Sequence, residues 1–200
     1  MAHKLSYTLI MVQKSLMKNS AKRAMTTFGQ KACIVIDHLV EALGSEPSSS
    51  IRRAQILVDI DQYPGSTQTA IMERLNVNKS ALNREIDWLF NYGCIMVQDN
   101  LQDARSKQIY ICGYSKKALD SALDYCENNH EKMKFFLHNT EKLLKQEKST
   151  LRDAKIVASL YEKKEAEKQG IIGSLYGGAP STDNRALNKL IETGIIEDDA

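Results

Sequence analysis

The chain has 200 residues and a mass of 22.5 kDa, enough for one ordinary domain with its own core, or for one domain that carries extensions. With 42% apolar and 26% charged residues it is too apolar for a disordered chain, and it has no run of about 18 apolar residues that would cross a membrane. The net charge of +2 does not by itself indicate a class of partner.

Charge is distributed unevenly along the chain. The first 36 residues contain six Lys or Arg and no acid, whereas residues 169–200 contain two basic and five acidic residues. A basic N-terminal part and an acidic C-terminal part are typical of a protein that binds a polyanion. An ordinary solvated surface is the alternative explanation.

Helices dominate the predicted elements, because the chain has only three prolines and ten glycines. Apolar residues at helical spacing predict helices over 5–18 and 21–43. The stretch 44–50, rich in Ser and Gly, predicts a loop, and its last residue, Ser50, is placed to cap a helix over 51–62.

Two short helices and a hairpin are predicted next. The helices cover 67–75 and 79–92, and β-forming residues predict strands over 94–98 and 107–112 around a polar tip. The residues expected to cap, separate or end these helices are Ser66 or Thr67 (first cap), Asn76 (left-handed turn), Asn78 (second cap) and Gly93 (stop).

The rest of the chain is predicted to be helical. Positions 119–161 alternate steps of four and three and are mostly apolar, which is typical of helix–helix packing within or between chains. Helix-start signals at Asn128 and Thr150 divide this seam into two or three helices. The glycine-rich stretch 170–180 predicts a connector, and Ser181 is placed to cap a last short helix.

The order helix, turn, helix, hairpin over 66–112 predicts a helix-turn-helix with a β-wing. Such a unit presents its second helix to the major groove of DNA and lays the hairpin along the neighbouring minor groove or backbone. Lys79, Asn83 and Arg84 lie off the apolar face of that helix and suit base edges and phosphates, while the Asn78 cap leaves backbone N–H groups that favour a phosphate. A solvated helix face is the alternative.

The motifs of this unit resemble the MarR (multiple antibiotic resistance regulator) family. Residues 73–82 (ERLNVNKSAL) and 88–95 (WLFNYGCI) are similar to its "ERL" helix, its recognition helix and the "LE..GL" segment before the wing. Residues 103–105 (DAR) stand where the family has its wing D-x-R, and 106–119 (SKQIYICGYSKKAL) resemble the strand and helix start that follow. The similarity covers roughly 50–125.

This resemblance implies that Arg105 enters the minor groove and that Asp103 orients it. An exposed ion pair at a hairpin tip is the alternative for these two residues. Lys117 stands where the family usually has Gly, and the terminal segments are longer than usual in the family. The candidate DNA-binding residues are Ser66, Thr69, Asn78, Lys79, Ser80, Asn83, Arg84, Asp103, Arg105 and Lys107.

The four cysteines, Cys33, Cys94, Cys112 and Cys126, lie far apart and show no metal-ligand spacing with the histidines. We therefore expect reduced thiols in a cytoplasmic protein and no metal site. Some members of the resembled family use a thiol in the region of Cys33 as a redox sensor, and a buried structural cysteine is the alternative.

The predicted fold is mainly α with a small β-wing, a winged helix-turn-helix with N- and C-terminal helical extensions for dimerisation. The predicted regions are a basic N-terminal helical extension over 1–48, the winged helix-turn-helix over 49–117, a long helical dimerisation region over 118–168, and a connector with a short helix over 169–200.

The predicted function is that of a sequence-specific, double-stranded-DNA-binding transcriptional regulator that acts as a homodimer, by default a repressor. We expect no enzymatic activity, no cofactor and no membrane partner. The expected location is the cytoplasm, on the nucleoid when the protein is bound to DNA. Whether a small-molecule effector binds is left open. Two alternatives stay open. One is a phage or plasmid replication or partition factor; the other is a winged-helix protein–protein assembly module without DNA binding.

Overall fold

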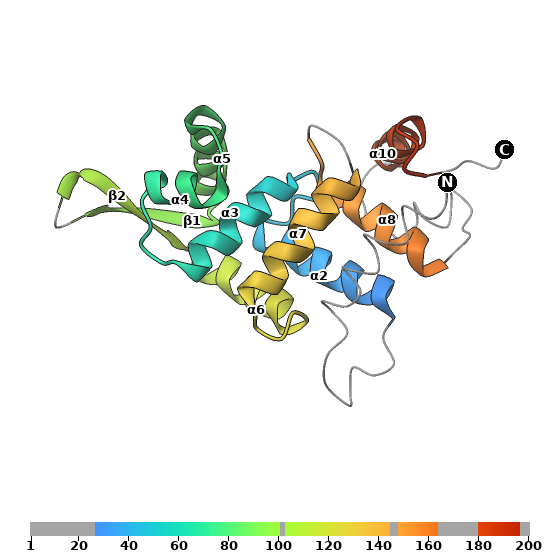
Figure 1. Ribbon diagram of the computed structural model, residues 1–200, viewed down its shortest axis with the longest axis horizontal. Coiled ribbons are helices and arrows are strands. Elements are labelled where there is room, and N and C mark those ends of the chain that lie inside the picture. Colours follow the sequence, from blue (N-terminus) through green and yellow to red (C-terminus); the bar gives the residue numbers. More distant parts are fainter. Residues whose placement is uncertain (1–26, 101–102, 145–147, 164–179, 197–200) are drawn as a thin grey trace.

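The computed structural model describes residues 27–100, 103–144, 148–163 and 180–196. In this part of the chain the fold is mainly helical with one two-stranded antiparallel sheet, as predicted (Figure 1). The elements are α2 (Phe28–Ala42), α3 (Ile51–Gln62), α4 (Gln68–Leu75), α5 (Lys79–Asn91), β1 (Ile95–Asn100), β2 (Asp103–Ile111), α6 (Gly113–Asp124), α7 (His130–Leu144), α8 (Leu151–Lys163) and α10 (Pro180–Glu192). The helix predicted over 5–18, the start of the one predicted over 21–43 and nearly all of the connector over 170–180 lie outside the described residues.

The helix starts follow the capping signals of the sequence in most places. Ser50 accepts a hydrogen bond from the backbone N–H of Arg53 and caps α3, as predicted. Thr150 and Asp153 hydrogen bond to each other's backbone N–H groups at the start of α8, as the capping-box signal predicted.

Two predicted starts are wrong. Helix α10 begins at Pro180, so Ser181 lies inside its first turn, where Pro is favoured because it needs no N–H partner. Helix α7 begins at His130 rather than near Asn128: Asn128 has a left-handed backbone with φ 52°, and the Asn129 side chain accepts a hydrogen bond from the N–H of Lys132.

Helices α4 and α5 and the hairpin form the winged-helix unit. Strands β1 and β2 pair with Ile95 opposite Ile111, and Ser66 bridges to Ile109 beside them, which ties the turn before α4 to the sheet. The polar tip predicted over 99–106 is too long, because β1 continues to Asn100 and β2 already begins at Asp103. In Figure 1 this hairpin projects at one end of an elongated molecule, with α8 and α10 toward the other end.

The apolar seam predicted over 119–161 is divided among α6, α7 and α8. Helix α2 packs against α6 and α8, and α3 packs against α7. Nine of the ten apolar seam positions are buried in a core shared with α2, α3, α5 and the sheet; Tyr161 remains 41% exposed. The buried positions are Leu119, Leu123, Cys126, Met133, Leu137, Leu144, Leu151, Ala154 and Ala158.

Two backbone segments far apart in sequence join the starts of α3 and α8. The N–H of Ile51 donates to the Ser149 carbonyl and the N–H of Leu151 donates to the Ser49 carbonyl, both at 2.9 Å, around an isolated bridge between Ser50 and Thr150. Because the two caps are paired in this way, the helical hairpin α7–α8 is fixed against α2–α3.

Helix α10 covers part of α8. Its Leu187 and Leu190 are buried, and its Asp183 pairs with Arg152 of α8, with both side chains almost fully enclosed. Within the described ranges, no helix combines the length and the apolar character that crossing a membrane requires.

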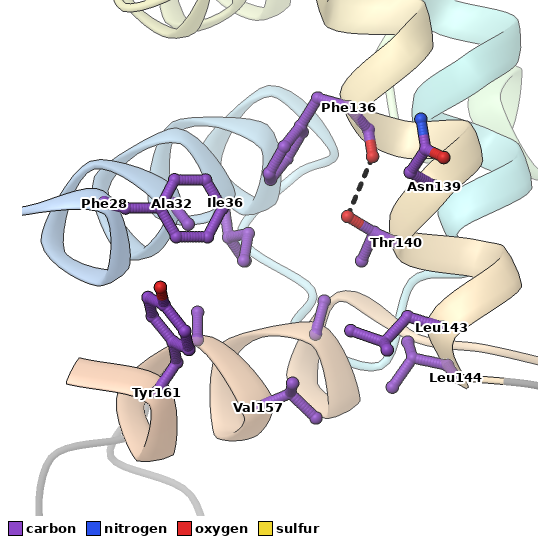
Figure 2. Close-up of a pocket in the computed structure, with 12 residues that line it drawn as sticks. Phe28, Ala32, Ile36, Phe136, Asn139, Thr140, Leu143, Leu144, Val157 and Tyr161 are labelled. Atoms are coloured by element: carbon purple, nitrogen blue, oxygen red, sulfur yellow. Dashed lines mark hydrogen bonds between the residues drawn. The ribbon is translucent and has the colours of Figure 1, made fainter. Parts of the chain in front are cut away.

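An apolar pocket lies among α2, α7 and α8 (Figure 2). Phe28 and Tyr161 meet edge to face at one side of it, with ring centroids 5.4 Å apart. On α7 the Thr140 hydroxyl donates to the Phe136 carbonyl at 2.8 Å, so this polar group at the pocket wall is already satisfied. The pocket therefore offers an apolar surface and no charged group.

Candidate nucleic-acid interface

The turn between α4 and α5 is built by two asparagines. Asn76 ends α4 with a left-handed backbone at φ 50°, as predicted, and Asn78 caps α5 by accepting a hydrogen bond from the N–H of Ala81 at 2.8 Å. The Ser80 hydroxyl donates to the same Asn78 oxygen at 2.9 Å. The tight turn sets α5 at an angle to α4 with the N-terminus of α5 at the surface.

Helix α5 separates an apolar from a polar face. Leu82, Ile86 and Leu89 are buried, whereas Lys79, Ser80 and Arg84 are exposed. Asn83 is half-buried, and its Oδ1 is enclosed without a hydrogen-bond partner among the described residues, so this side chain lies at the edge of the polar face. The polar face also carries the exposed acid Asp87 and is not purely basic.

A contact with α3 fixes the orientation of α5. The Arg53 Nε donates to Glu85 Oε2 at 2.7 Å, and the Arg53 guanidinium lies 4.0 Å from the centre of the Trp88 ring. Trp88 in turn stacks on Tyr92 with the centroids 3.9 Å apart. Trp88 is half-buried and also packs against the apolar core.

A second charged contact fixes α4. The Arg74 guanidinium binds both carboxylate oxygens of Asp59, which is fully buried in α3, at 2.6 to 3.1 Å. Lys134 of α7 donates to the same carboxylate at 3.3 Å. The helix-turn-helix is therefore connected by charge to the helical body as well as to α3.

The structure places Ser66 inside this network. Its hydroxyl donates to the Tyr63 carbonyl at 2.7 Å and accepts from Arg74 Nη2 at 2.8 Å. The residue that caps α4 is Thr67, which accepts from the N–H of Ala70, and Thr69 is exposed in the first turn. Of the two predicted caps Thr67 is therefore right, and the Ser66 hydroxyl is engaged within the protein.

The hairpin brings the remaining candidates beside this helix pair. Lys107 is exposed on β2 opposite Asp99 of β1. Asp103 and Arg105 belong to β2 near the hairpin tip, and the structure describes their backbone only. The predicted role of Arg105 in a minor groove therefore stays a prediction.

Sequence reasoning missed Arg53, Asp59 and Glu85, the residues that position the two helices. Their partners lie 15 to 75 positions away in the chain, and no local spacing marks such pairs. The one available signal was the pair of acids Asp59 and Asp61 within an otherwise apolar stretch of α3.

Comparison with known proteins finds a family model and several solved structures. Residues 50–107 match the model of the MarR family. Among curated proteins none matches the chain. Among solved structures, "MarR" has 14% identity and a TM-score of 0.38, with 71% of this chain and 93% of that one covered. The transcriptional regulator Tm0710 from Thermotoga maritima has 15% identity and a TM-score of 0.38, with 82% and 90% covered.

Another similar structure is an uncharacterised SlyA-like transcription regulator from Listeria monocytogenes, with 15% identity, a TM-score of 0.34, and 73% of this chain and 79% of that one covered. Because these TM-scores and identities are low, the family similarity rests on the matched segment and the fold rests on the observed order of helices and strands. The resemblance predicted from the motifs is therefore confirmed for residues 50–107, which match the MarR family over the helix-turn-helix and most of the wing.

Proposed function

We propose that the chain is a sequence-specific, double-stranded-DNA-binding transcriptional regulator that acts as a homodimer and represses by occluding a promoter. The observation that carries this proposal is the polar face of α5, where Lys79, Ser80 and Arg84 are exposed beside a hairpin that bears Lys107. A projecting helix followed by a wing suits the major groove and its neighbouring backbone. The family match over 50–107 supports the same function.

Each candidate residue has a proposed role. Arg84, Lys79 and Asn83 face base edges or phosphates in the major groove, and the capped start of α5 at Asn78 and Ser80 approaches a phosphate. Thr69 and Lys107 contact the DNA backbone on either side of the major groove. In the wing, Arg105 enters the minor groove with Asp103 orienting it. Because its hydroxyl is engaged with Arg74, we assign Ser66 to the positioning of α4.

A second copy of the chain is proposed as the other partner. Two winged helices would read half-sites about one helical turn apart, and the helices outside 49–117 would form the dimer body. The pocket among α2, α7 and α8 is lined mostly by apolar side chains and suits contact with apolar side chains of a second copy. Sedimentation equilibrium at several concentrations tests this part: a mass that stays at the 22.5 kDa of one chain would contradict it.

The DNA proposal is tested by selecting genomic fragments with the purified protein and titrating the best fragment by gel shift. Arg84→Ala is expected to lower the affinity about 10- to 100-fold, since a good base contact contributes about 1–3 kcal/mol. Arg105→Ala is also expected to lower the affinity. Binding of the unmodified protein should weaken steeply with added salt.

Lys142→Ala is the matched control, because it removes an exposed positive charge from α7, a helix of the body. Its affinity should equal that of the unmodified protein, and circular dichroism should show equal helicity for all variants. Salt-insensitive or absent binding together with a large oligomer would favour the assembly module instead. Bound fragments that come from origins or repeat arrays rather than promoters would favour a replication or partition factor.

A further inference from the structure

Two cysteines lie opposite each other at the base of the wing. The register of the hairpin places Ile95 opposite Ile111, so the next pair along the ladder is Cys94 and Cys112. The N–H of Cys112 donates to the Cys94 carbonyl at 2.9 Å, which extends the ladder to this pair. Both thiols are free. Residues directly opposite on antiparallel strands carry their side chains on the same face, so the two sulfurs share one face of the hairpin.

The two cysteines differ in burial and in the contacts of their side chains. Cys112 is the N-cap residue of α6, and its side chain makes no capping hydrogen bond. The Cys94 thiol donates a hydrogen bond to the Tyr92 carbonyl at 3.8 Å. Burial raises the pKa of this thiol, and the side chain of Ser115, buried in the first turn of that helix, opposes the shift. Cys94 therefore lies near the helix start that Cys112 occupies. Cys94 is fully buried and Cys112 is half-exposed, so Cys112 is the sulfur that a reagent in solution reaches first.

We propose that Cys94 and Cys112 are a modification site, at which a hydroperoxide converts the two thiols into a reversible disulfide across the base of the wing. In the first step the Cys112 sulfur attacks one peroxide oxygen and the O–O bond breaks, which gives a sulfenic acid and, with hydrogen peroxide, one water. In the second step the Cys94 sulfur attacks the Cys112 sulfur, the S–O bond breaks, and the hydroxyl leaves as a second water with the proton from Cys94. Two thiols and one peroxide thus give one disulfide and two waters.

The backbone geometry determines the character of this bond. Residues opposite in an antiparallel pair have Cα atoms about 5.5 Å apart, within the range of natural disulfides. Their Cβ atoms are about 4.5–5.5 Å apart, whereas a disulfide needs about 3.5–4.5 Å, so closure draws the two strands together. A bond formed with such a shift is more easily reduced than a relaxed one, and this favours a reversible bond over a permanent structural one. Burial raises the pKa of both thiols, so the reaction at neutral pH is slow and needs excess peroxide.

Mass spectrometry of the full chain tests the proposal directly. After treatment with hydrogen peroxide and blocking of free thiols, trypsin cuts after Arg105 and Lys107, so Cys94 and Cys112 leave in different peptides. We expect these two peptides to be joined, two hydrogens lighter than their sum, and separated again by dithiothreitol. On a non-reducing gel the oxidised chain should run as a single chain.

Two variants make the test specific. Cys112→Ser should abolish the joined peptide, whereas Cys33→Ser, the matched change of a half-exposed cysteine between α2 and α8, should leave it unchanged. The urea midpoint of the oxidised protein should rise and return to its original value on reduction, and Cys112→Ser should show no such shift. The proposal is overturned if both cysteines are recovered blocked or as sulfinic acids, or if Cys94 is joined to Cys33, Cys126 or a second chain.

Discussion

Asp59 is a fully buried carboxylate whose charge is balanced by Arg74 of α4 and Lys134 of α7. Removing Arg74 leaves the buried carboxylate with Lys134 as the remaining one of these two partners, and weakening a buried pair is more costly than losing an exposed one. Arg74→Ala is therefore expected to lower the free energy of unfolding by about 3 kcal/mol, measured by urea denaturation. Arg185→Ala removes an exposed arginine from α10 and should change the free energy of unfolding by less than about 0.5 kcal/mol. Equal effects would show that the Asp59 contact does not stabilise the fold.

Cys126 gives the protein a stability that depends on alkaline pH. Burial raises the pKa of this thiol from its ordinary value of 9.0 to about 12; Lys132 opposes the shift and Glu127 adds to it. Below pH 9 the thiol is protonated in the folded and the unfolded state. Between pH 9 and about 12 only the unfolded state releases the proton, so the free energy of unfolding falls by up to about 1.4 kcal/mol per pH unit.

Urea midpoints of the unmodified chain and of Cys126→Ala, compared at about pH 8 and about pH 10, test this expectation. Alanine does not titrate, so the variant should lose less stability over this range, although it is less stable at the lower pH because a buried sulfur is missing. An equal loss of stability in both proteins between the two pH values would contradict the assignment to Cys126, because the two proteins share every other titrating group, including the buried Cys94.

Gly65 connects α3 to α4 in a conformation that excludes other residues. Its φ is +77°, and a Cβ there would lie 2.9 Å from the Tyr110 hydroxyl of β2. Gly93 has a similar φ of +67° with open space around it. Gly65→Ala combines backbone strain with a clash and should destabilise the fold by about 2–4 kcal/mol, whereas Gly93→Ala should cost about 1–2 kcal/mol for the backbone alone.

The second change Tyr110→Phe separates the two contributions at Gly65. It removes the hydroxyl that the new Cβ would meet, so it should recover part of the stability lost in Gly65→Ala when both are present. Thermal melts of the single and double variants give the coupling. Strict additivity of the two changes would show that the clash with Tyr110 contributes nothing.

At the scale of elements, local signals in the sequence predicted most of the winged helix. Helix α3 has the predicted bounds, and α4 and α5 differ from theirs by one residue at one end, because Ser50, Asn76 and Asn78 act within three residues of the helix ends that they define. The start of α7 was misplaced because Asn128 and Asn129 compete: Asn128 takes a left-handed backbone and its neighbour makes the capping contact. The start of β2 was missed because polar residues pair in a projecting hairpin without a core to mark them.

At the scale of the molecule, the sequence predicted which segment forms the candidate site, but it did not predict which distant residues hold that segment in place. Asn78, Lys79 and Arg84 follow from the helix spacing, whereas Arg53 with Glu85 and Asp61 with His130 join residues 32 and 69 positions apart. Such pairs arise only after α3 has packed against α5 and α7, and charged residues at those distances carry no periodic signal. The same packing joins the winged helix and the helical body in one apolar core.

A shared core implies that the winged helix and the helical body unfold together. Leu144 is fully buried at the end of α7 beside α8, and Trp88, the single tryptophan, lies on α5. Leu144→Ala should lower the free energy of unfolding by about 3 kcal/mol through the cavity it leaves. If the core is cooperative, the urea midpoint followed by Trp88 fluorescence falls by as much as the midpoint followed by far-ultraviolet circular dichroism, although the substitution is in another part of the fold. A Trp88 midpoint that stays in place while the dichroism midpoint falls would instead show two units that unfold separately. In that case the apolar contacts of α3 with α7 would be an interface between two domains.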